Sequence, residues 1–280
     1  MLVQFSDRNW LWAAAALYLL GFLQGTVALV RGGRPSGTAT YLIVVAGYVV
    51  QIIGLAVRGR AVGGCPLGNS LELYQFIAWS AITLYIMVGV TFRNSLLGYF
   101  TSCLAATLTL VSLAIPQWDA TQRMHIFGSN PWIELHAALA VFSYGVFGLL
   151  AMTSILYLLR NYSLRSKNIG GRFSFLPSIL DLDHIGVRLL TAGVAILTIS
   201  LSIIWAFWLR SPGSAGLTKV FFAMVVWIIA TLVLGLRLRG VLLSKRFAWA
   251  CVGLFVGALV SLVAVDHSRN PAAITSISHT

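Results

Sequence analysis

The chain has 280 residues, of which 59% are hydrophobic and only 9% charged, and its formal net charge is +12. This much apolar surface exceeds what a soluble fold needs, and it indicates an all-α, polytopic transmembrane helical bundle. The basic residues lie in short loops between apolar runs and form no stripe on a soluble domain, which argues against nucleic-acid binding.

About eight stretches are long and apolar enough to cross a bilayer, which takes roughly 20 residues at ~1.5 Å per residue. In chain order they cover roughly residues 10–30, 38–57, 71–92, 95–115, 133–159, 187–209, 217–236 and 247–266. The first is of full span length, so we expect a retained helix and not a cleaved signal peptide. With no internal repeat and no separate soluble domain, residues 1–280 are expected to form a single integral membrane domain with a short polar tail, 268–280.

Basic residues in the loops predict the orientation of these spans. Nine of the 19 lysines and arginines fall between the fifth and sixth spans or between the seventh and eighth, which assigns both loops to the cytoplasm and both termini to the outer, periplasmic side. Arg31, Arg34 and Arg93 fall on the same cytoplasmic side. Arg58 and Arg60 oppose this pattern, because they lie on the outer side. The loop residues are Arg160, Arg165, Lys167, Arg172, Arg188, Arg237, Arg239, Lys245 and Arg246.

Two histidines lie at the outer ends of spans: His136 begins the fifth and His267 ends the eighth. Together, two imidazoles could clamp a metal or a heme iron from opposite faces. Each alone is more simply an interfacial histidine with its ring among the lipid headgroups. Glu134 falls on a different helix face from His136, so a hydroxyl or carboxylate from another span is the better candidate to orient that ring. His125 lies in the same outer compartment.

Other side chains allow both structural and functional interpretations. Trp205 and Trp208 close the sixth span, where the ordinary interpretation is an aromatic belt and the alternative is a flat surface for a porphyrin. The cysteines Cys65, Cys103 and Cys251 show no metal or redox spacing, and Cys103 and Cys251, within apolar spans, are interpreted as small hydrophobes. Cys65 precedes Pro66 in a loop, where a Cys-Pro pair could ligate heme through its thiolate, but a structural role is the favoured interpretation. Sequence signatures of hydrolysis, hydride transfer and phosphoryl transfer are absent from the chain.

An ordered series of short motifs resembles the cytochrome c assembly protein family, the CcsA/HemX-like heme-handling membrane proteins. The resemblance covers about residues 45–267. The segments that carry it are Arg58 to Glu72 with Cys65-Pro66-Leu67-Gly68-Asn69, Pro131-Trp132 with Leu135-His136 and Ser143-Tyr144, Leu182-Asp183 through Gly193, Trp205-Ala206, Lys219, Trp227 and Arg237 to Gly240.

This resemblance implies cytochrome c biogenesis in a bacterial inner (plasma) membrane. His136 and His267 would be the axial ligands of an external heme, with Trp205 and Trp208 near its edge. The partners implied are apocytochrome c and a membrane subunit of the maturation system. The thioether chemistry would belong to the heme vinyl groups and the cysteines of the substrate, so the chain would be a heme-binding assembly factor in a heme lyase system and not a stand-alone enzyme.

The chain departs from the family pattern at two places, and these departures limit which heme sites are expected. The tryptophan-rich outer loop of the family has a Trp-Asp-Pro-Lys-Glu core, whereas this chain has Gly216-Leu217-Thr218-Lys219-Val220. Members that carry heme across the bilayer have a histidine within each of two spans, and Gln51 and Gly235 occupy those places here. A transmembrane heme site is therefore not expected.

Two alternatives remain open from the sequence. One is a scaffold or accessory subunit of the maturation complex that binds no heme. The other is a small-solute transporter, a class that tends to show paired half-repeats and broken helices, neither of which is visible in the sequence.

Overall fold

The structure, a computed structural model, describes residues 2–31, 36–89, 97–120, 130–165, 178–210 and 217–267. Over these residues it is entirely helical, as the hydropathy pattern predicts. The elements are α1 (Leu2–Val30), α2 (Gly37–Val62), α3 (Ser70–Gly89), α4 (Leu97–Ala114), the 3₁₀ turn η1 (Pro116–Asp119), α5 (Pro131–Arg165), α6 (Ile179–Arg210), α7 (Leu217–Leu238) and α8 (Ser244–His267). The polar tail lies outside the described residues.

Several helices extend beyond their apolar cores, and this corrects two predicted boundaries. The sixth helix begins at Ile179 and not near 187, because Ser178 accepts a hydrogen bond from the Asp181 amide at 3.1 Å and donates to its carboxylate at 2.6 Å. The fifth continues to Arg165, so the connection between them is shorter than expected. The C-terminal end of α2 is capped by Gly63, whose left-handed φ of 72° favours glycine.

Six of the described helices are long and apolar enough to cross a membrane: α1, α2, α5, α6, α7 and α8. The apolar part of α4 is shorter, and α3 lies against the core with polar side chains in its first turns. The chain is thus a multi-pass helical membrane protein, and a count of eight spans stays a prediction.

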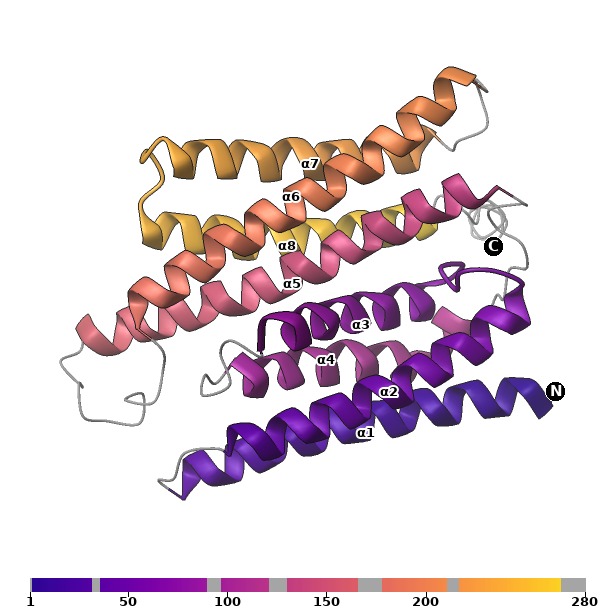
Figure 1. The fold of residues 1–280 in the computed structure, drawn as a ribbon, viewed down its shortest axis with the longest axis horizontal. Coiled ribbons are helices and arrows are strands. Elements are labelled where there is room, and N and C mark those ends of the chain that lie inside the picture. Colours follow the sequence, from indigo (N-terminus) through magenta and orange to yellow (C-terminus); the bar gives the residue numbers. More distant parts are fainter. Residues whose placement is uncertain are drawn as a thin grey trace, which may run out of the picture.

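The helices form two groups of four, α1–α4 and α5–α8, joined mainly where α3 packs on α5 (Figure 1). Within each group the first helix lies beside the second and the fourth, and the third lies beside the fourth. In the most apolar part of α5, 72% of the residues are buried, compared with 22% in α7, so α5 is an inner helix.

Successive helices run in opposite directions, so every second connection between helices lies at the same end of the bundle (Figure 1). One end holds the start of α1, the 63–69 loop, η1, the start of α5 and the last turns of α6 and α8. We call this the His136 end. Both helices that carry the predicted histidine pair reach it.

Candidate functional site

His136 lies in the second turn of α5, which begins at Pro131. Proline suits the first helical position, where its missing N–H would have no partner. The side chain of Asn130 accepts a hydrogen bond from the Trp132 amide at 3.1 Å and so satisfies another free donor of this turn. These local features fix where α5 starts and therefore which turn carries His136.

Ser200 of α6 contacts His136 at three points. The ring nitrogen Nδ1 lies 2.8 Å from the Ser200 carbonyl oxygen and 2.9 Å from its Oγ, and that hydroxyl donates to the His136 carbonyl at 2.8 Å. Ser200 is fully buried and His136 is half-buried. A hydroxyl from another helix therefore contacts this ring, as the sequence led us to expect.

All of these ring contacts fall on one nitrogen of His136. Among the described residues, none forms a hydrogen bond with Nε2. Histidines that bind metals in proteins usually donate their other ring N–H to a carbonyl, carboxylate or water. His136 therefore has the arrangement of an imidazole that coordinates through Nε2.

His267 is the last residue of α8, and its side chain lies outside the described residues. Farther from the His136 end, α5 and α8 are linked by the Tyr144 and Ser261 hydroxyls, whose oxygens are 3.5 Å apart. His136 precedes Tyr144 by a helical path of about 12 Å, and His267 follows Ser261 by about 9 Å, at ~1.5 Å per residue. The two histidine backbones are therefore at similar heights in adjacent helices.

Trp205 and Trp208 lie on the exposed part of α6, with ring centroids 5.7 Å apart. At roughly 100° per residue, Trp208 is turned roughly 80° and Trp205 roughly 140° from Ser200 around the helix axis. Trp205 is 55% exposed. It therefore shares the α6 face of Thr198, which accepts from the Trp227 indole at 2.8 Å, and it is not brought beside His136.

Trp132 is an aromatic residue that the sequence analysis did not assign to the site. It precedes His136 by four residues, so both side chains project from one face of α5. It also lines a pocket of about 450 Å³ between α5 and α6. The remaining lining residues are Thr198, Ile199, Ser202, Ile203, Ala206 and Phe207. The spacing of Pro131-Trp132 and His136 was the signal that could have identified it.

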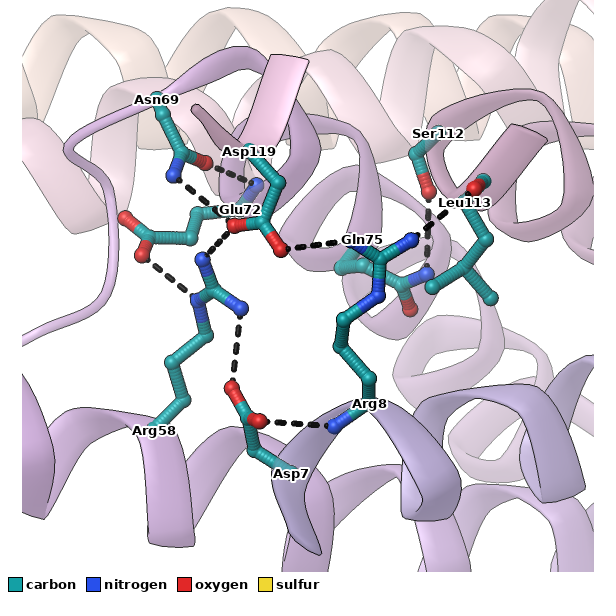
Figure 2. A network of polar contacts seen from close by, with 9 residues as sticks. All are labelled: Asp7, Arg8, Arg58, Asn69, Glu72, Gln75, Ser112, Leu113 and Asp119. Carbon is teal, nitrogen blue, oxygen red and sulfur yellow. Dashed lines mark hydrogen bonds and ion pairs between the residues drawn. The ribbon is translucent and has the colours of Figure 1, made fainter. Parts of the chain in front are cut away.

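The same end of the first helical group contains a buried ion cluster centred on Arg58 (Figure 2). Its guanidinium is fully buried and binds three carboxylates: Glu72 at 2.7 Å, Asp7 at 2.9 Å, and Asp119. Arg8 adds an ion pair to Asp119 at 3.0 Å. This cluster explains why Arg58 opposed the orientation pattern, since its charge is neutralised inside the protein.

A chain of contacts runs from this cluster to the first turn of α5. The second carboxylate oxygen of Glu72 accepts from the Gly68 amide at 2.5 Å, which holds the 63–69 loop. At the other side of that loop, the Cys65 amide donates to Glu134. Glu134 therefore ties the loop to α5 two residues before His136, and it does not orient that ring, as the sequence predicted.

Burial raises the pKa of the Cys65 thiol to about 12, with further contributions from the negative charges of Glu134 and Glu72. The thiol is therefore protonated at neutral pH. A protonated thiol is a poor nucleophile and a poor metal ligand, which agrees with the structural interpretation of this cysteine.

Gln51 and Gly235, which the resemblance predicts at the positions of the family's transmembrane histidines, have different surroundings. The Gln51 amide is buried and fully engaged: it accepts from Tyr18 at 2.8 Å and donates to the Gln75 side chain at 2.8 Å. A Cβ built on Gly235 would meet nothing within 4 Å. Gln51 thus contributes to the packing of the first group, and neither residue offers an iron ligand.

Of the remaining histidines, His184 is exposed at the opposite end of the bundle, and His125 and His279 lie outside the described residues. Within the described parts of the chain, no group of three or more His, Cys, Asp and Glu could hold a metal ion. A heme iron does not require such a group, because the porphyrin supplies four of its ligands.

Comparison with known proteins agrees with the residue motifs. The family described as cytochrome C assembly protein matches residues 67–264. Protein HemX of Bacillus subtilis is 24% identical over 68% of this chain and 70% of its own length, and protein HemX of Brevibacillus brevis is 26% identical over 70% of each. Cytochrome c biogenesis protein CcsA of Chlamydomonas reinhardtii is 26% identical over 74% of this chain and 60% of its own length.

The matched region runs from the 63–69 loop to the last turns of α8, so it contains the His136–Ser200 contact, Glu134 and the junction of α3 with α5. It covers well over half of the chain, while the identity to each of these relatives is low. The chain is a divergent member of the cytochrome c assembly protein family.

Proposed function

We propose that this chain takes part in cytochrome c biogenesis in a bacterial inner membrane by binding heme at the His136 end through His136 and His267. It would present the heme to apocytochrome c together with a membrane partner subunit. Membership of the family and the relatives named for cytochrome c biogenesis support the pathway.

The observation that carries the proposal is the state of the His136 ring. Its Nδ1 is occupied by Ser200 and its Nε2 is not hydrogen-bonded by any described residue. Histidines that bind metals are usually held in this way, by a hydrogen bond at the ring nitrogen that does not coordinate. The nearby end of α8 brings a second histidine to a similar height, which is what two axial ligands of one iron require.

The residues present fit a heme group. His136 and His267 would hold the iron, and Trp132, on the same face of α5 as His136, would supply aromatic surface beside it. When bound, heme supplies the vinyl groups that form thioether bonds with the substrate's cysteines. The chain's own residues bind and orient: Ser200 fixes the His136 ring, and Glu134 holds the loop beside it.

Titration of purified protein with heme tests this proposal. We expect a bis-histidine absorption spectrum for the wild-type protein, and its loss in His136→Ala and in His267→Ala. His184→Ala is the matched control, because His184 is exposed at the opposite end. Equal spectra for all four proteins, or no heme binding at all, would favour the scaffold alternative.

A further inference from the structure

We infer that Ser200 is the positioning residue that fixes the tautomer and the orientation of His136, so that Nε2 is the nitrogen presented to an iron. The inference rests on the proposed function for its ligand, but the state of the ring belongs to the protein without heme. It concerns the contact between α5 and α6, the most extensive pairing in the second helical group.

The hydrogen positions follow from what each oxygen can do. The Ser200 carbonyl oxygen only accepts hydrogen bonds, and it lies 2.8 Å from Nδ1. The Ser200 hydroxyl has one hydrogen, and it points to the His136 carbonyl, which also only accepts. Towards Nδ1 the hydroxyl oxygen can therefore offer only a lone pair.

Both oxygens near Nδ1 are thus acceptors, and Nδ1 must carry a hydrogen. In the alternative tautomer the Nδ1 lone pair would face the lone pair of the Ser200 carbonyl at 2.8 Å, which is repulsive, and the hydroxyl could donate to Nδ1 only by giving up its bond to the His136 carbonyl. In a neutral imidazole only one nitrogen is protonated, so Nε2 keeps the free lone pair. The contact selects the tautomer that iron needs.

The same residue also fixes the ring in space. Its hydroxyl bridges the His136 ring and the His136 main chain, so side chain and backbone are held by one buried group. A hydrogen bond from the distal ring N–H orients a ligating histidine and increases its basicity. Ser200 thereby prepares the ligand before any heme arrives.

The first test uses the protein without heme. Nitrogen NMR of histidine-labelled protein, with the His136 signal identified through His136→Gln, reports which ring nitrogen is protonated. We expect Nδ1 to be protonated in the wild-type protein, and part of this signal to move to the other tautomer in Ser200→Ala. A wild-type ring protonated at Nε2 alone would overturn the inference, whether or not the protein binds heme.

The second test is heme affinity. Loss of such a hydrogen-bonding group typically lowers metal affinity about 10- to 100-fold, and because the Ser200 carbonyl remains, we expect about a 10-fold loss in Ser200→Ala. Ser200→Thr, which retains the hydroxyl, should restore most of the affinity. Thr191→Ala is the matched control, because its hydroxyl donates within α6 to the Val187 carbonyl and it does not line the pocket beside Trp132.

These outcomes separate the two proposals. Wild-type affinity in Ser200→Ala would overturn the role of Ser200 while leaving the proposed heme site intact. Absence of heme binding in the wild-type protein would overturn the proposed function, and the NMR result would still decide the tautomer. A shift in the electron paramagnetic resonance of the bound iron in Ser200→Ala would support positioning, since a purely structural loss would lower occupancy without changing that signal.

Discussion

The first turns of α5 carry two polar side chains that bind different parts of the molecule. Glu134 binds the Cys65 amide in the 63–69 loop, and His136 binds Ser200 in α6. Two residues apart on a helix, they point to different neighbours. One short stretch of sequence therefore joins the two helical groups and holds the candidate ligand.

The high pKa of Cys65 predicts slow alkylation. Near pH 8 the thiolate fraction should be on the order of 10³-fold lower than that of a free cysteine of pKa about 8.5. The rate should rise with pH until pH approaches the folded pKa of about 12, because only then does the thiolate predominate. Stopped-flow labelling in a Cys103→Ser, Cys251→Ala background measures this.

Glu134→Gln provides a comparison for this prediction. Removing that negative charge lowers the pKa of Cys65, so labelling at a given pH should become faster. A Cys65 that reacts as fast as free cysteine at pH 8, before and after this change, would contradict the burial of the thiol.

At the scale of elements, the Arg58 cluster joins α1, α2, α3 and η1 at one point. Removing one partner of a buried ion pair leaves uncompensated charge in a medium of low dielectric constant, and it typically costs about 3–5 kcal/mol. The cluster should therefore contribute strongly to the stability of the first helical group, although it lies apart from the candidate ligands.

We expect Arg58→Met to lower the free energy of unfolding by about 3–5 kcal/mol, because Asp7, Glu72 and Asp119 lose their shared cation. Arg58→Lys should recover only part of the loss, since a single ammonium cannot match the fork geometry of guanidinium. Arg60→Met, at an exposed position, is the control. Tryptophan fluorescence during denaturation in detergent measures the difference, and equal stability of the Met variants would refute the assignment.

Some of these elements could be predicted from sequence and others could not. Apolar run lengths predicted the helices and their alternation, whereas the sidedness inferred from the loop charges stays a prediction. Both faces of a membrane helix are apolar, so periodicity does not tell which helix packs against which. For that reason Ser200 could not be selected among the serines of the chain, nor could Arg58 be paired with Asp7 and Asp119. The sequence did predict that a hydroxyl or a carboxylate from another span would contact the His136 ring, because Glu134 lies on a different face of the helix.

At the scale of the whole molecule, two four-helix groups with the same neighbour order meet at α3 and α5. This internal correspondence was not visible in the sequence. Paired halves are typical of many transporters, but the broken helices that accompany them there do not occur among the described spans, each of which is continuous from its first residue to its last.

The junction of the two groups depends on Gly145 of α5. A Cβ there would lie 1.7 Å from the Ser80 hydroxyl and 2.7 Å from the Ile77 carbonyl, so α3 and α5 would have to separate. Gly145→Ala should cost about 1–3 kcal/mol through overpacking. Gly257→Ala, with nothing within 4 Å, should not.

Adding Ser80→Ala to Gly145→Ala should restore part of the stability, because one of the clashing atoms is removed while the Ile77 carbonyl remains. Denaturation of the single and double variants measures this coupling. Strict additivity of the two substitutions would show that the helices do not approach as closely as described.

The alternation of helices also predicts sidedness. Reporter domains fused to the N-terminus and inserted near Gly64 should lie on the outer side of the membrane, and one inserted at Gly240 in the basic α7–α8 turn should lie in the cytoplasm. Reporter activities with the opposite assignment would reverse the orientation, and with it the side of the membrane on which the proposed heme site lies.

The carboxylates around Arg58 come from both sides of it in the chain, and this orders events during synthesis. Asp7 leaves the ribosome before the arginine, whereas Glu72 and Asp119 emerge after it. The nascent second helix thus enters the translocon with its cation only partly matched. Arg58 can be paired with all three carboxylates only once η1 has been synthesised, and none of these three partners comes from α5 or from the helices that follow it.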